Sequence, residues 1–250
     1  MSLVSAVDEF QASFSTRAPF TYEMIVYTVC CSQVSLPPTV LEETVSTLVK
    51  RVSDDEQRVV LLRVLREVAT TTHVFAGVPR AIVGAAAVRS CAKELGLLDS
   101  LAVDAPAGRV AGTTSDMMNR GWDAFERVYG PTSHLVRTVL RRASPSLERI
   151  VLVSAYGMTL AHEGSEDAPF SLLERELCAV VALRTVLAPP QLKSHIAGAS
   201  RVGATAAEIT SALAIAQQAE VWATANQELT QEVVQNHLKQ LNVEEIISEQ

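Results

Sequence analysis

The chain has 250 residues, of which 48% are hydrophobic and 5% aromatic, and it carries a formal net charge of −7. The negative charge argues against nucleic acid as a partner, because nucleic acid requires a basic face. No apolar run approaches the roughly 18 residues that cross a bilayer, so we expect no membrane partner. The N-terminus lacks the order of a secretory signal, and we expect a cytoplasmic protein, with a mitochondrial location not excluded.

The remaining composition favours an all-α fold. The length is enough for one large or two fused smaller domains with a sizeable core. Leucine, alanine and valine are abundant while glycine is sparse at 11 residues, which favours packed helices over a sheet.

Four cysteines are present, and none belongs to a C-x-x-C motif. Their neighbours are mostly apolar, which indicates buried free thiols. No cysteine or histidine spacing is typical of a metal site, so we predict neither a metal nor a cofactor. The cysteines are Cys30, Cys31, Cys91 and Cys178.

Prolines, glycines and capping boxes divide the first half of the chain. A capping box is a Ser or Thr followed three residues later by an acid that reaches back to it. Ser53 with Glu56 forms such a pattern and predicts the start of a long helix that ends before Gly77. The expected elements are a short helix or frayed arm over 1–17, helices over 21–35 and 39–51, the long helix, and a helix over 80–95.

The second half follows a stretch rich in Pro, Gly and Thr over 97–115, which predicts a linker. Trp122, Phe125 and Tyr129 follow at helical spacing and are expected to be core residues. Two further capping boxes are predicted, at Ser171 and Thr205. The expected elements are a helix from 121 to 129, helices over 133–142, 146–161, 171–187 and 191–202, an acidic loop over 162–170, and a tail or interface helix over 227–250.

The same short motifs, which contain prolines, occur twice in the chain. Ala-Pro-Phe stands at 18–20 and at 168–170, and a Pro-Pro pair at 37–38 and at 189–190. Such matched landmarks predict two fused, related helical repeats. We expect a degenerate first repeat over 1–100, a linker over 101–115 and a second domain over 116–250. At the positions of Glu176 and His195, we expect Met24 and Glu43 in the first repeat.

Residues 172–208 carry a recognisable pattern. Leu-Leu-Glu-Arg-Glu-Leu at 172–177, Pro-Pro-Gln-Leu-Lys-Ser-His at 189–195 and Gly-Ala-Thr-Ala-Ala-Glu at 203–208 resemble the carboxymuconolactone decarboxylase family. The same superfamily includes alkylhydroperoxidase D. The resemblance implies an AhpD-like helical bundle, and it implies a homo-oligomer, a trimer by analogy.

The peroxidase branch of that superfamily uses a glutamate, a C-x-x-C pair and a histidine. Glu176 and His195 have the spacing of its glutamate and histidine, but Ala188 and Gln191 occupy the two cysteine positions. Because peroxide reduction by this route needs one thiolate to attack and a second thiol to resolve, the resemblance disfavours a peroxidase.

The decarboxylase branch implies acid–base chemistry on a small carboxylate or lactone, with His195 and Glu176 as catalytic candidates. Arg175, Arg184 and Arg201 are the candidates to bind a substrate carboxylate, since a guanidinium matches it with two hydrogen bonds. Arg184 shares a face with apolar residues and is expected to be buried. An uninterrupted helical hairpin would leave Glu176 and His195 out of register by about 8 Å, so only a helix crossing, or the fold that the resemblance implies, brings them together.

Three functions stay open at this point. The first is a cofactor-free lyase or isomerase with a small-molecule substrate. The second is a non-catalytic helical scaffold or small-molecule binder, in which His195 and Glu176 are structural or capping residues. The third is a hydroperoxidase, which the absence of C-x-x-C disfavours.

Overall fold

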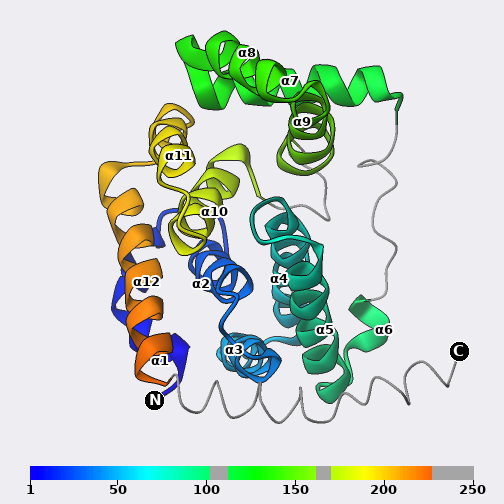
Figure 1. The fold of residues 1–250 in the computed structure, drawn as a ribbon. Helices are drawn as coiled ribbons and strands as arrows, with labels where there is room; N and C mark the ends of the chain where they lie inside the picture. Colours follow the sequence, from blue (N-terminus) through cyan, green and yellow to red (C-terminus); the bar gives the residue numbers. More distant parts are fainter. Residues whose placement is uncertain (102–111, 162–169, 227–250) are drawn as a thin grey trace, which may run out of the picture.

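The computed structural model describes residues 1–101, 112–161 and 170–226, and in these ranges it contains helices and no strand (Figure 1). The predicted all-α class is confirmed. None of the described helices has the length and apolar character to span a membrane. The elements of the first half are α1 (Leu3–Val7), η1 (Asp8–Phe14), α2 (Thr21–Ser32), α3 (Pro38–Lys50), α4 (Asp55–Ala76), α5 (Val78–Glu94) and α6 (Leu98–Leu101).

The second half contributes two groups of helices. Of these, α7, α8 and α9 lie together at the top of Figure 1, while α10, α11 and α12 lie beside the helices of the first half. The elements are α7 (Thr114–Tyr129), η3 (Gly130–Thr132), α8 (Ser133–Ala143), α9 (Pro145–Arg149), η4 (Ile150–Leu160), α10 (Leu172–Thr185), α11 (Pro189–Arg201) and α12 (Ala206–Ala225).

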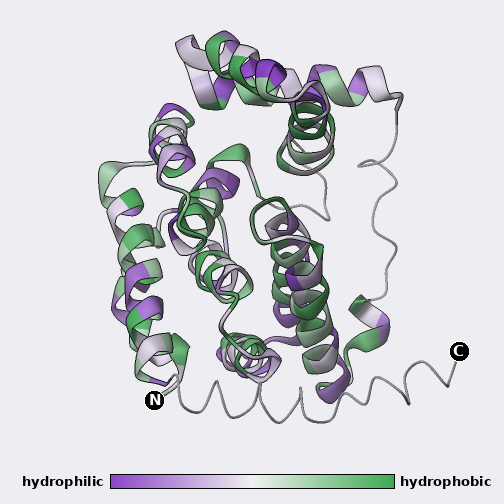
Figure 2. Ribbon diagram, viewed as in Figure 1, coloured by the Kyte–Doolittle hydropathy of each residue, from purple (hydrophilic) through white to green (hydrophobic). Residues whose placement is uncertain are grey.

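One hydrophobic core joins helices from both halves of the chain. Residues of α2 and α4, such as Val26 and Leu65, and residues of α10 and α12, such as Val181 and Ile215, belong to the same buried cluster. Figure 2 shows polar and apolar residues alternating along α12, at the edge of this body. Burial of such a cluster is the main favourable term in folding. The two predicted repeats therefore share a core, whereas the predicted linker falls largely on 102–111, outside the described residues.

A second, smaller core lies between α7 and η4. It contains Phe125, Leu152 and Tyr156. A Cβ atom added to Gly121 would lie 1.8 Å from the carbonyl oxygen of Leu152, and one added to Gly157 would lie 2.1 Å from that of Met117. Only glycine permits such close approach of two helix backbones. This contact fixes η4 against α7.

Several predicted boundaries differ from the structure. Asp54, and not Ser53, caps α4, because the Asp54 side chain accepts a hydrogen bond from the Gln57 amide. The helix predicted from 121 begins at Thr114, after a capping box of Thr113 and Asp116 that the sequence analysis missed.

The helix predicted over 146–161 consists of the short α9 and the π-helix η4. A π-helix has a wider hydrogen-bonding pattern than an α-helix and is often found at functional sites.

The predicted capping boxes at Ser171 and Thr205 are confirmed. The predicted tail over 227–250 and the acidic loop up to residue 169 lie outside the described residues.

The starts of three consecutive helices repeat along the chain. The starts of α2, α3 and α4 precede those of α10, α11 and α12 by 151 residues each. With this offset, Ile25 and Thr44 occupy the positions of Glu176 and His195, which corrects the assignment of Met24 and Glu43. Neither Ile25 nor Thr44 is titratable near neutral pH. The paired carboxylate and imidazole are specific to the second set of helices.

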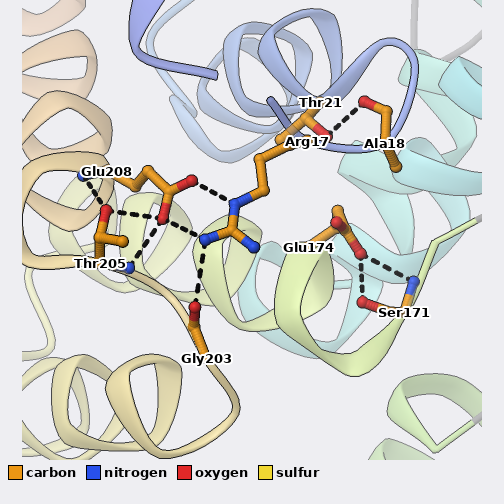
Figure 3. Close-up of polar contacts among 8 residues, drawn as sticks. All are labelled: Arg17, Ala18, Thr21, Ser171, Glu174, Gly203, Thr205 and Glu208. Carbon is orange, nitrogen blue, oxygen red and sulfur yellow. Dashed lines mark hydrogen bonds and ion pairs between the residues drawn. The ribbon is translucent and has the colours of Figure 1, made fainter. Parts of the chain in front are cut away.

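The first 17 residues form a packed arm. Leu3 and Val7 are buried, and the Trp222 indole of α12 donates a hydrogen bond to the carbonyl of Met1. Arg17 reaches from this arm to the starts of α10 and α12 and pairs with Glu208 (Figure 3). Of the two alternatives for this segment, the short helix holds and the frayed arm is wrong.

Candidate active site

Glu176 and His195 meet in the interior of the protein. The Nδ1–H of His195 donates to Oε2 of Glu176 over 2.8 Å, from α11 to α10. The two residues are 0% and 5% exposed. The register difference expected for a straight hairpin therefore does not keep the two side chains apart, and α10 packs directly against α11. A hydrogen bond between a carboxylate and an imidazole is strong in such an environment, since little water competes for it.

A close approach of three helices makes this meeting possible. A Cβ atom on Gly198, one turn after His195, would lie 2.7 Å from the Val128 side chain of α7 and 2.9 Å from Oε2 of Glu176. Arg201, one turn further on, donates from Nη1 to the Val128 carbonyl over 2.5 Å. Gly198 and Arg201 therefore hold the end of α7 against α11, directly beside the Glu176–His195 pair.

Aromatic rings surround the imidazole. The rings of Tyr129 and Phe75 stand edge-on to His195, with centroids 5.9 Å and 6.4 Å away. Tyr129 comes from the end of α7, and Phe75 from the end of α4. The imidazole is therefore enclosed by three different helices besides its own.

One polar atom of the pair, Oε1 of Glu176, is buried and makes no hydrogen bond to any described residue. Because Nδ1 carries the proton donated to Glu176, Nε2 is the basic nitrogen of the neutral ring. Unsatisfied buried polar atoms are rare in folded proteins and are concentrated where a protein binds or reacts.

Tyr129 and Tyr156 border the same carboxylate. Burial raises the pKa of Tyr129, a hydrogen bond with Tyr156 opposes this rise, and the charge of Glu176 adds to it. Burial, followed by interaction with Tyr129 and Glu176, holds the pKa of Tyr156 well above its ordinary value. The two hydroxyls lie close enough to influence each other, but Tyr156 Oη makes no hydrogen bond of standard geometry. Both are protonated donors at neutral pH.

The sequence analysis missed these tyrosines as site residues. Tyr129 was assigned to the core on helical spacing, and it does pack against Phe125 with ring centroids 4.2 Å apart. Tyr156 had no local signal, because the π-helix that positions it is not encoded in a recognisable pattern. Only the packing of η4 on α7, and of α7 on α11, brings both hydroxyls near Glu176.

Arg175 is fully buried, but it faces away from the pair. Its Nη1 donates to Thr71 over 3.2 Å and lies 3.5 Å from the carboxylate of Glu67. It also stacks on Phe170, with its guanidinium carbon 4.8 Å from the ring centroid. Its charge is thus compensated by groups of the fold. Beside it lies an apolar cavity of about 10 Å³, the volume of about one water. Phe75 lines this cavity and also faces His195.

The other two predicted arginines are engaged elsewhere. Arg184 pairs with Glu220 over 2.9 Å, and its side chain is 31% exposed, so the expectation that it is buried is wrong. The reason is its place in the last turn of α10, beyond the core that covers Val180 and Val181. Arg201 binds the Val128 carbonyl.

The four cysteines are buried and free, as predicted. Burial raises the pKa of Cys30 and of Cys178 to about 12. Burial also raises the pKa of Cys31 and Cys91. A thiol with so high a pKa is a poor nucleophile at neutral pH, because the thiolate is the reactive form. Within the described residues, no group of side chains could hold a metal ion.

Comparison with known proteins supports the resemblance seen in the sequence. Residues 153–230 match the model of the carboxymuconolactone decarboxylase family. Over 108 residues the chain is 35% identical to Peroxisomal protein 2 of Schizosaccharomyces pombe, a match that covers 43% of this chain and 49% of the relative. The match thus spans about half the length of that relative. No solved structure matches the chain.

Proposed function

We propose that Glu176 and His195 catalyse a proton transfer on a small lactone or carboxylate. Both residues lie within 153–230, the range that matches the carboxymuconolactone decarboxylase family. The observation that carries the proposal is the buried 2.8 Å hydrogen bond between them. The carboxylate fixes the imidazole with Nδ1–H toward it, so that Nε2 faces the substrate as the base.

The contacts of the arginines support a lactone over a free carboxylate at this point. Arg175 and Arg184 are paired with Glu67 and Glu220, and Arg201 is bound to a carbonyl. Glu176 would repel a second carboxylate placed beside it. The lactone carbonyl therefore fits beside Glu176, while the carboxylates of a substrate such as carboxymuconolactone would point away from it. Removal of a proton from the carbon next to the carbonyl needs a general base.

In the reaction that we propose, His195 Nε2 takes a proton from the carbon next to the lactone carbonyl, and the C–H electron pair forms a carbon–carbon double bond. The carbonyl electron pair moves to oxygen. Return of the proton at another carbon completes an isomerisation. In a decarboxylation of a lactone that carries a carboxylate, the electron pair of the broken bond to carbon dioxide follows the same course, and Nε2 of His195 takes a proton from water and delivers it to the product carbon.

The test is turnover of carboxymuconolactone by the purified full chain, followed by its ultraviolet absorbance and by released carbon dioxide. We expect His195→Gln and Glu176→Gln to reduce kcat by about 10² to 10⁴-fold, the usual contribution of a positioned acid–base group. His134→Gln is the matched control, since the His134 side chain is 80% exposed, and it should keep full turnover. Full turnover in His195→Gln would contradict the proposal.

The second candidate is a non-catalytic helical scaffold or binder. The small cavity favours it, because 10 Å³ does not admit a lactone without movement of a side chain. In that case the pair would serve stability alone. His195→Gln and Glu176→Gln would then lower the melting temperature while no lactone is turned over by the wild type.

A hydroperoxidase stays disfavoured. Ala188 and Gln191 stand at the cysteine positions, and the thiols that do exist are buried with raised pKa values. A homo-oligomer, trimeric by resemblance, and the division into two fused repeats stay predictions. The cytoplasmic location also stays a prediction, and the name of the yeast relative, which assigns that protein to peroxisomes, points to a different compartment to be tested.

A further inference from the structure

Tyr129 and Tyr156 lie on elements that do not carry Glu176 or His195, yet the Tyr129 ring contacts both the imidazole of His195 and the ring of Tyr156. We propose that their hydroxyl groups form the donor half of the site and hold the neutral carbonyl oxygen of the substrate while negative charge develops on it. This inference rests on the proposed function and adds the residues and the ligand chemistry that the acid–base pair alone does not specify.

The geometry of the aromatic cluster is the first argument. The Tyr129 ring contacts His195, with centroids 5.9 Å apart, and Tyr156, with centroids 6.4 Å apart. Phe125 packs on both tyrosines, at 4.2 Å and 5.1 Å between centroids, and therefore limits their rotation. The hydroxyls are held in place by packing, which is the condition for donors to be organised before a reaction.

The unsatisfied atoms are the second argument. Tyr156 Oη and Glu176 Oε1 are buried without a hydrogen bond of standard geometry. A buried polar atom whose hydrogen bond is missing or poorly formed destabilises the folded protein by about 1–3 kcal/mol. This loss of stability is offset when a ligand supplies the missing hydrogen-bond acceptor. The groups near Tyr156 Oη are the hydroxyl of Tyr129 and the carboxylate of Glu176.

The charges specify the class of ligand. The site combines one carboxylate, one imidazole and two protonated hydroxyls, and the predicted arginines are engaged elsewhere. A ligand oxygen must accept hydrogen bonds from the tyrosines without bringing a full negative charge beside Glu176. The carbonyl oxygen of a lactone or ketone meets both conditions, whereas a carboxylate does not.

The backbone supports the same assignment. Gly157 follows Tyr156 and allows η4 to approach α7, while Gly198 and Arg201 hold the end of α7, with Tyr129, against α11. The contacts of α7 with η4 and with α11 thus fix the position of the two hydroxyls relative to His195.

The experiment uses γ-butyrolactone labelled with ¹³C at the carbonyl as the probe, with the full chain and its Tyr129→Phe and Tyr156→Phe variants. We expect a downfield carbonyl shift of the bound lactone in the wild type, because a hydrogen bond withdraws electron density from the carbonyl carbon. We expect this shift to be lost or reduced in both variants. The ring-opened 4-hydroxybutyrate, a carboxylate with the same carbon chain, should bind at least about tenfold more weakly.

Turnover provides the second readout. Each Tyr→Phe change should lower kcat for carboxymuconolactone by about 10² to 10³-fold, as expected on removal of a donor to a developing oxyanion, with little change in KM. Circular dichroism should show unchanged folding, since each change removes one oxygen atom. Phenylalanine variants that keep the carbonyl shift and kcat would overturn the inference.

The two proposals fail in different ways. If His195→Gln abolishes turnover while both tyrosine variants retain it, the donor role is overturned and the proposed function stands. If the wild type shifts the lactone carbonyl through its tyrosines but turns over no lactone, the proposed function fails and the carbonyl-binding site stands. Absence of any carbonyl shift in the wild type overturns the carbonyl-binding site itself.

Discussion

Phe75 lies between the imidazole of His195 and the small cavity beside Arg175. Its ring stands edge-on to His195 on one side and lines the small cavity beside Arg175 on the other. It lies in the last turn of α4, just before Gly77, whose φ of 83° ends the helix. The position of one side chain therefore decides whether the cavity and the imidazole are connected.

Removal of this ring should make His195 accessible. We expect diethyl pyrocarbonate, which acylates neutral imidazole nitrogen, to modify His195 about tenfold faster in Phe75→Ala than in the wild type, because local opening no longer limits access. Peptide mass spectrometry gives the rate for each histidine. His134 is the internal control, since it is exposed in both proteins and its rate should not change. An unchanged rate at His195 would show that Phe75 does not close the site.

At the scale of elements, the contact between α7 and η4 depends on two glycines. The Cβ of an alanine at Gly121 would lie 1.8 Å from the Leu152 carbonyl oxygen, and backbone cannot yield as a flexible side chain does. The two helices must then separate, and with them Tyr129 from Tyr156.

Gly121→Ala should therefore lower the free energy of unfolding by about 3 kcal/mol, at the upper end of the usual cost of overpacking. Denaturation in urea measures this change. Asn119→Ala is the matched control, because Asn119 is exposed on the same helix and alanine favours helix. The control should stay within about 0.5 kcal/mol of the wild type. An equally small effect at Gly121 would contradict the close packing of α7 and η4.

At the scale of the whole molecule, Arg17 joins the N-terminal arm to the second set of helices. Its guanidinium pairs with Glu208 at the start of α12 and donates to the Gly203 carbonyl over 3.1 Å (Figure 3). The hydrogen bond from Arg17 is the largest cause that lowers the pKa of Glu208 to about 2, against an ordinary value of 4.5. The capping contacts from Thr205 lower it further.

This pKa shift makes the stability of the contact depend on pH. Because the pKa of Glu208 is lower in the folded state, the contact stabilises the protein above about pH 4.5, and the stabilisation is lost as the pH falls towards 2. We expect Arg17→Met to lower the free energy of unfolding by about 2 kcal/mol at pH 7. The difference from the wild type should shrink below pH 4.5.

The matched control is Arg184→Met, which removes a more exposed ion pair with Glu220 and should cost less than about 1 kcal/mol. Urea denaturation from pH 7 to pH 3 compares the three proteins. A cost for Arg17→Met that stays constant over this range would show that the charge of Glu208 is not part of the contact.

Much of the fold follows from local signals in the sequence. Pro37-Pro38 and Pro189-Pro190 begin α3 and α11, and the capping residues Ser171 and Thr205 begin α10 and α12, because the conformations of these residues are restricted by their own covalent structure and nearest neighbours. The 19-residue spacing of Glu176 and His195 was also visible, and it identified both members of the pair.

The all-α class, most helix ends and the identity of the two residues that pair, Glu176 and His195, thus follow from the amino-acid sequence. Only the packing of the helices places Glu176 against His195, leaves Arg184 at the surface, and brings Tyr129 and Tyr156 to the site from α7 and η4. The two kinds of feature differ in the distance along the chain over which their contacts act. Caps and breaks act over one helical turn, whereas the position of a side chain relative to a partner on another helix depends on close backbone contacts, such as those at Gly121 and Gly198, that no local pattern specifies.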